Sequence, residues 1–177
     1  WVGYSLLVGV TTRVVWGFLG SYHARFVNFV RGWREALLFL KTQLPTRGHN
    51  PLGAYSTLAL LTVLFVQCIT GLFSSNEFDF EGPLSYAAGD LAPKLSQWHE
   101  FNWDILRGLI MLHLIAIVYY QAWKRWPLIQ TMWFGSVSQR SGMTEAEPAW
   151  KACVIAVLSA LILGSLVYWA PTAPPLY

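Results

Sequence analysis

Two histidines stand in one long apolar stretch, at a spacing suited to holding two iron-containing groups. His99 and His113 are fourteen residues apart in a segment, 98–125, that is predicted to form one helix. At 100° per residue their imidazoles lie within about 40° of each other, and at 1.5 Å per residue they lie about 21 Å apart along the axis. Because a bilayer core is about 30 Å thick, this helix face could present one imidazole toward each side of a membrane, to two stacked haems.

A single histidine in a helix is more often a hydrogen-bonded core residue or an interfacial one than a ligand. His99, between Trp98 and Glu100, fits an interfacial position as well as a ligand position. His113 lies in the sequence GLIMLHLIAIVYY, where an ionisable side chain is costly and therefore indicates function. His113 is thus the stronger candidate. Imidazole is a good ligand of haem iron, and two axial imidazoles suit electron transfer.

One helix cannot hold an iron from both sides, so each haem needs a second axial ligand from elsewhere. His23 and His49 are the other histidines, and both fall in a basic segment at the wrong depth for an outer haem. The 177 residues therefore do not complete two bis-histidine sites. Either residues outside this sequence supply the partners, or the two-haem interpretation fails.

Three further polar residues each have two interpretations. Arg13, inside an apolar stretch, either snorkels to the inner membrane face or provides a counter-charge for a haem propionate or a quinone headgroup. His49, in GHNPLG, either caps the next helix or contacts a propionate or quinone at the inner surface. Arg107 lies on a different face from the two histidines, and we expect it to pair with Asp104 at helical spacing or to meet a cofactor carboxylate.

The composition is that of a membrane protein, with 55% hydrophobic and only 12% charged residues. The net charge of +3 is small, and the basic residues stand beside apolar spans, so no nucleic-acid partner is expected. Cys68 and Cys153 are isolated in apolar runs and read as small buried hydrophobes. There is no C-x-x-C-H motif, so any haem is not attached in the c-type manner.

Four apolar stretches are long enough to cross a bilayer, which predicts an all-α transmembrane helix bundle. They cover about 1–20, 50–73, 98–125 and 150–170, and Asn50-Pro51 suits a helix start. The basic, amphipathic segment 22–50 is predicted to lie at least partly on the membrane surface as an interfacial helix.

The loop charges predict an orientation. Segment 22–50 and the connector after Lys124 are rich in Lys and Arg and should face the cytoplasm. The acidic loop 74–97 should face the outside, which places His99 near the outer surface and His113 deeper. Trp1 then also lies outside without a preceding signal segment, so we expect one more span upstream.

An ordered series of motifs covers about residues 1–135. It runs WVGYSLL, RVVWGFLGSYHARFVNFVRG, GHNPLGA, the acidic FDFEGPL and WHE…N…HLIAIVYYQ. This series resembles the bacterial cytochrome b561 family, which belongs with the b-type cytochrome subunits of nickel–iron hydrogenases. The resemblance implies a four-helix haem-binding bundle of the bacterial inner membrane that exchanges electrons between quinone and a periplasmic partner. It also implies that His99 holds the outer haem and His113 the inner one, with the other ligands upstream of Trp1.

The sequence departs from the family pattern in two places. Residues 136–177, a connector and a further span, are extra to the four-helix unit, so the added helix offers a surface for another subunit. Arg107 stands where the family pattern leads us to expect an apolar residue.

Three functions follow as hypotheses. The first is a di-haem b cytochrome, within a larger respiratory-chain complex, that transfers electrons between ubiquinone and a periplasmic protein such as a basic cytochrome c. The second is a stand-alone superoxide:ubiquinone oxidoreductase, which the acidic outer loop disfavours because an anionic substrate requires a positive patch. The third is a haem-free structural subunit whose histidines relay protons or form an interface.

Overall fold

The computed structural model describes residues 2–22, 24–30, 32–42, 51–75, 81–130 and 148–171. Among these residues four helical segments are long and apolar enough to cross a membrane, and no strand is present. The predicted all-α bundle with four spans is therefore confirmed. The spans are α1 (Val2–Leu19), α4 (Pro51–Phe73), a segment containing α6 (Ala92–Val118), and α8 (Ala149–Tyr168).

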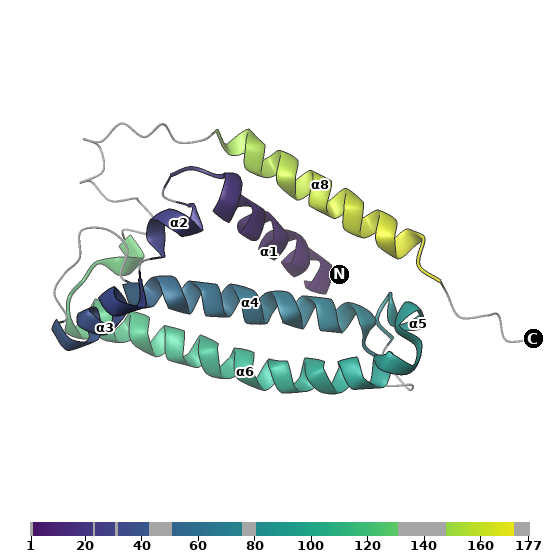
Figure 1. Cartoon of the computed structure of the whole chain (residues 1–177), viewed down its shortest axis with the longest axis horizontal. Coiled ribbons are helices and arrows are strands. Elements are labelled where there is room, and N and C mark those ends of the chain that lie inside the picture. The colour runs from purple at the N-terminus through teal and green to yellow at the C-terminus, as the bar shows by residue number, and fades with distance from the viewer. Residues whose placement is uncertain are drawn as a thin grey trace, which may run out of the picture.

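The long helices lie side by side in the order α6, α4, α1 and α8 (Figure 1). α4 packs against α6 on one side and against α1 on the other, and α8 packs on α1. This arrangement agrees with the sequence of α4, which is apolar all round, as expected for a helix covered on two sides. It also places α6 with one covered face and a broad exposed one.

α6 begins at Ala92, earlier than the predicted start at Trp98. Pro93 suits the first turn of a helix, where its missing N–H costs nothing. The Ser96 hydroxyl donates to the Ser75 carbonyl at 2.7 Å and accepts from the Ser75 N–H at 2.9 Å, which ties this first turn to the end of α4. These tertiary contacts extend the helix into residues whose own sequence is too polar to predict it.

The predicted outer loop 74–97 is correspondingly shorter than expected. Its described second half contains α5 (Ser85–Ala88) and the 3₁₀-helix η1 (Gly89–Leu91), which lead directly into α6. At its other end α6 widens into the π-helix η2 (Tyr119–Trp123) and ends there, before the predicted Arg125. Arg125 adopts a left-handed φ of 56°, which turns the chain out of the helix.

The basic segment after α1 forms two short helices, α2 (Phe26–Phe29) and α3 (Trp33–Thr42). α3 is amphipathic and packs on α4, with Ala36 and Phe39 buried, while Leu37 and Leu38 remain exposed. This confirms an amphipathic helix over 33–42, whereas residues 43–50 lie outside the described ranges.

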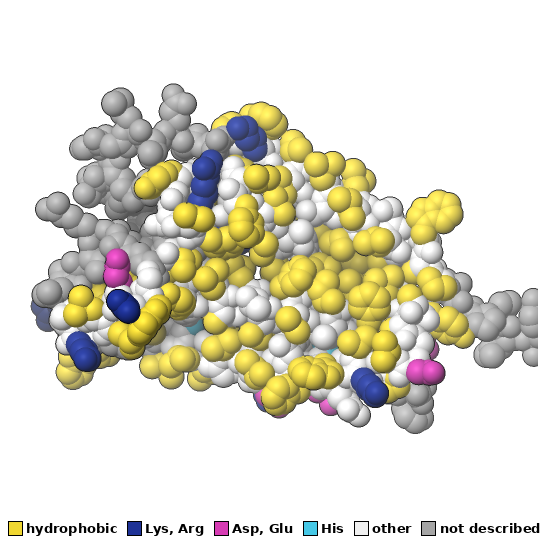
Figure 2. Space-filling view, in the orientation of Figure 1, with side chains coloured by type: hydrophobic (Ala, Val, Ile, Leu, Met, Phe, Trp, Pro, Cys, Tyr) yellow, Lys and Arg dark blue, Asp and Glu magenta, His cyan; other side chains and the backbone are white. Residues whose placement is uncertain are grey.

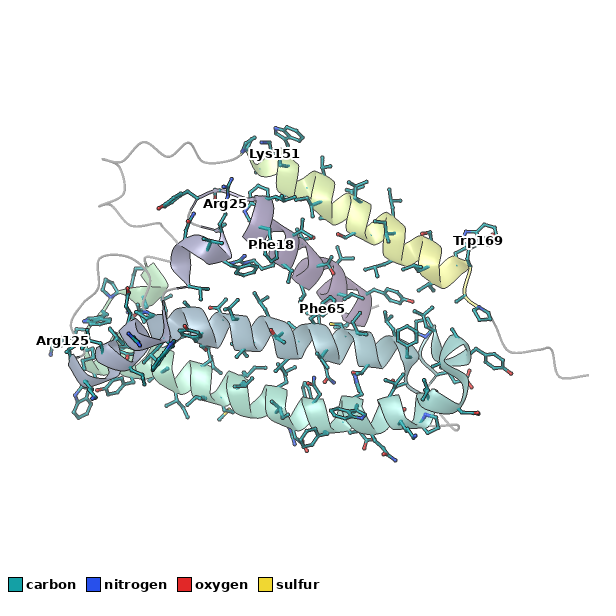
Figure 3. The ribbon with its side chains drawn as sticks, viewed as in Figure 1. Phe18, Arg25, Phe65, Arg125, Lys151 and Trp169 are labelled. Carbon is teal, nitrogen blue, oxygen red and sulfur yellow. The ribbon has the colours of Figure 1, made fainter. Side chains whose placement is uncertain are left out.

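Most charged side chains in view lie toward the ends of the bundle, a few lie along its lower edge, and hydrophobic side chains cover much of the visible surface of the long helices (Figure 2). Arg25, Arg125 and Lys151 lie toward one end, and Trp169 lies toward the other (Figure 3). The end opposite the basic one carries Glu81 and Asp90 at the entry to α6. The described residues of the bundle thus have a basic end and an acidic end.

Candidate functional site

The structure places His99 and His113 on the face of α6 that packs against α4. Both imidazoles are partly buried, and the same face carries the buried Asn102 and Leu106. The shared face predicted from the fourteen-residue spacing is therefore present, and α4 is the helix that meets it.

The imidazole of His99 is held through both of its nitrogens by α4. Nδ1 lies 3.1 Å from the carbonyl oxygen of Gln67 and 3.1 Å from the hydroxyl of Thr70. That hydroxyl already donates to the Val66 carbonyl at 2.8 Å, so both groups near Nδ1 are acceptors. These partners assign the proton to Nδ1 and leave a lone pair on Nε2, where the Gln67 side-chain amide donates at 3.0 Å.

The side chain of Gln67 is oriented by Asn102. The Asn102 amide donates to Gln67 Oε1 at 2.6 Å and to the Val63 carbonyl at 3.0 Å. Because Gln67 Oε1 is occupied by this donor, the Gln67 NH₂ group is directed at His99. Asn102 is itself buried, and both of its hydrogen bonds cross from α6 to α4, so the network is part of the α4–α6 contact.

His113 makes the equivalent contact with α4 about 21 Å further along α6. Its Nδ1 lies 3.0 Å from the hydroxyl of Ser56 on α4, which can accept the Nδ1 proton. In the part of the chain that the structure describes, Nε2 of His113 makes no recorded hydrogen bond. The lone pair of Nε2 is then available to a ligand.

Sequence reasoning missed the polar residues of α4, although a signal for them exists. Ser56 and Thr70 are fourteen residues apart, the same interval that separates His99 from His113. On two antiparallel helices, equal intervals place both polar pairs at matching depths. Two hydroxyl residues of an apolar span, separated by the same interval as the two histidines, are therefore candidates for hydrogen-bond partners of those histidines.

Gly71 permits the close approach of the His99 ring. A Cβ at this position would lie 2.9 Å from Cε1 of His99 and 3.3 Å from its Nδ1. We expect Gly71→Ala to displace the His99 ring while leaving His113 in place, because no such contact involves His113. In a haem-loaded protein, a redox titration should show a shifted midpoint potential for one haem only. Unchanged potentials for both haems would contradict this role of Gly71.

The other predicted site residues lie apart from these networks. The Arg13 guanidinium reaches α2, 5.3 Å from the centre of the Phe26 ring and 3.5 Å from the Ala24 carbonyl. Arg107 pairs with Asp104, as predicted, on an exposed side of α6. His49, like His23, lies outside the described residues.

The arrangement fits a haem better than a metal ion held by protein ligands alone. The described residues contain no group of three or more His, Cys, Asp or Glu side chains that could enclose an ion. A haem supplies four nitrogen ligands itself and needs only axial ones from the protein. Ligating histidines characteristically donate their second ring N–H to a carbonyl or another acceptor, and both histidines here have such partners.

Comparison with known proteins agrees with this chemistry. A family model described as prokaryotic cytochrome b561 matches residues 1–135. The chain belongs to the prokaryotic cytochrome b561 family. Membership implies a haem of the b type, and with four candidate spans it identifies a multi-pass membrane protein. The cytochrome b561 match includes His99 and His113 and ends before α8.

Two curated relatives are named as probable Ni/Fe-hydrogenase B-type cytochrome subunits. The protein of Azotobacter vinelandii is 29% identical over 154 residues, which cover 73% of this chain and 62% of the relative. The protein of Rhizobium leguminosarum bv. viciae is 27% identical over 152 residues, with coverages of 73% and 63%. The chain thus spans less than two thirds of the length of these relatives. No solved structure matches it.

Proposed function

We propose that this chain belongs to a membrane-bound di-haem b-type cytochrome that carries electrons between quinone and a redox partner on the acidic side. The observation that carries the proposal is the pair of anchored imidazoles on one face of α6, about 21 Å apart by helix geometry. Family membership supports the b-type haem.

In this proposal two residues of α6 would each hold a haem, His99 on the acidic side and His113 on the basic side. The haem would supply one-electron chemistry at iron, and the protein would supply position and electrostatics. Ser56, Thr70 and the Gln67 carbonyl accept the Nδ1 protons, which orients each ring and increases the basicity of the ligating nitrogen. For Nε2 of His99 to hold a haem, the Gln67 amide that now donates to it would have to move away.

A second histidine for each haem would have to come from outside the described residues, which contain only His99 and His113. Arg13 and His49 remain candidates for contact with a haem propionate or a quinone headgroup near the basic end. The Arg13 guanidinium lies over the ring of Phe26 in α2.

The acidic end supports a basic redox partner. Ser75, Tyr86, Glu81 and Asp90 line an open groove where α5 meets the start of α6. A negative surface attracts a basic protein, such as a cytochrome c, and repels an anion such as superoxide. We therefore favour protein-to-quinone electron transfer over superoxide oxidation, with the acidic end periplasmic and the basic end cytoplasmic in a bacterial inner membrane. The names of the relatives and the additional helix α8 support a place within a larger complex.

A haem count tests the proposal. The natural-length protein, purified in detergent, should show a b-type reduced-minus-oxidised spectrum and two pyridine haemochromes per chain. Two haems are expected because two histidines with separate anchors lie at different depths of one helix. One haem per chain would contradict the di-haem arrangement, and a colourless protein would favour the haem-free structural subunit.

A further inference from the structure

The side of α6 that faces away from α4 carries a regular stripe of exposed residues. At 100° per residue its members lie within about 60° of the direction opposite to His99 and His113. Met111, Ile115 and Val118 on it are 59%, 60% and 63% exposed. We call this set the outer stripe of α6; its members are Asp104, Gly108, Met111, Ile115 and Val118.

Asp104 of the outer stripe belongs to an ion pair that lies far from either end of the span. Asp104 pairs with Arg107, and their side chains are 64% and 60% exposed. Neighbouring contacts fix the level of this pair, because Asn102 bonds the Val63 carbonyl and His113 bonds Ser56. The pair therefore lies beside the middle of α4, about 15 Å of helix rise from the end of that span at Phe73.

Charged side chains at this depth do not face lipid without a large cost. Intramembrane Asp and Arg residues almost always face protein or a water-filled cavity and pair with other groups. An arginine can reach water from near a helix end, but here the distance exceeds the length of its side chain. The outer stripe is therefore a poor surface to present to lipid.

We propose that the outer stripe packs against the same stripe of a second copy of this chain, about a two-fold axis along the membrane normal. The intervals along the stripe are 4, 3, 4 and 3 residues, which is the seam of two parallel helices that coil around each other. A Cβ at Gly108 would meet nothing within 4 Å, so the backbone there is open to close approach by another helix.

The charged residues of this surface can pair with the same residues of a second copy. Arg107 flanks the seam one residue before Gly108, within reach of Asp104 of the second copy. Two Asp and two Arg side chains then form one neutral cluster, in which every charge has an opposite neighbour in both copies. An isologous contact needs this kind of self-complementarity. This contact between two copies would form with or without bound haem.

Cysteine cross-linking in native membranes tests the proposed contact. The background protein carries Cys68→Ala and Cys153→Ala, because both native cysteines are unpaired thiols. With Met111→Cys, a mild oxidant should produce a disulfide-linked product of twice the chain mass. Ile110→Cys is the matched control, since it lies at the same depth, is 40% exposed and points about 100° away.

The outcomes separate the possible occupants of the stripe. Cross-linking at Met111→Cys at least tenfold above Ile110→Cys supports the dimer. Equal cross-linking at both positions, a product with a different chain, or no product would overturn it. Asp104→Arg alone should abolish the product, and the exchanged pair Asp104→Arg with Arg107→Asp should restore it. Because the exchange keeps both charges, its success excludes misfolding as the cause, and a product unchanged by Asp104→Arg would overturn the charge pairing.

Discussion

Replacing His113 by alanine is expected to lower the haem content from two to one per chain. His113 offers the only imidazole among the described residues at its depth, so a small side chain there would remove the group proposed to hold one haem. The haem held through His99 should remain, because its ring is anchored by a separate set of residues. Pyridine haemochrome analysis of the purified protein measures the change directly.

The complementary variant and a control complete this test. His99→Ala should remove the other haem, leaving a spectrum that differs in band position or potential from that of His113→Ala. Leu112→Ala, at the exposed neighbour of His113, should retain both haems. Retention of two haems by His113→Ala would exclude this residue as a ligand, and retention of both by His99→Ala would make His99 an interfacial residue.

Removing the hydroxyl of Ser56 is expected to weaken one haem site without touching the other. In Ser56→Ala the Nδ1 proton of His113 loses its acceptor, and loss of such outer partners typically reduces metal affinity by about 10- to 100-fold. Haem titration of the apoprotein should show this loss at one site, and a redox titration should show a shifted midpoint potential for the same haem.

Removing the Thr70 hydroxyl beside His99 should reduce haem affinity less than removing the Ser56 hydroxyl beside His113. Thr70→Val leaves the Gln67 carbonyl as an acceptor for Nδ1 of His99, so that ring keeps part of its anchoring. Thr57→Val is the control, because the Thr57 hydroxyl bonds the Gly53 carbonyl within α4 and meets neither histidine. If Thr70→Ser keeps the midpoint potential of the haem at His99 and Thr70→Ala shifts it, then the Thr70 hydroxyl, and not its packing, sets that potential. Equal effects of Ser56→Ala and Thr57→Val would refute the assignment.

The hydrogen-bond partners of the two histidines were the main feature that the sequence did not predict. His113 has no polar neighbour along its own helix, and its partner Ser56 is 57 residues distant in the chain. Gln67 lies in the apolar sequence of α4 and Asn102 lies in the polar first half of α6, and only the packing of α4 on α6 joins them into a network. No helical period relates residues on different helices, so these contacts could not be derived from spacing within α6.

The sequence by itself determined the number of spans, their approximate limits and the shared face of His99 and His113. These features are local: the bilayer demands about twenty apolar residues per crossing, and the period of an α-helix sets which residues share a face. Only the tertiary structure decided that this face meets α4, that α6 begins at Ala92, and that the Asp104–Arg107 pair points away from the bundle. Those outcomes depend on which helix surfaces pack together, and packing joins residues whose separation along the chain carries no periodic signal.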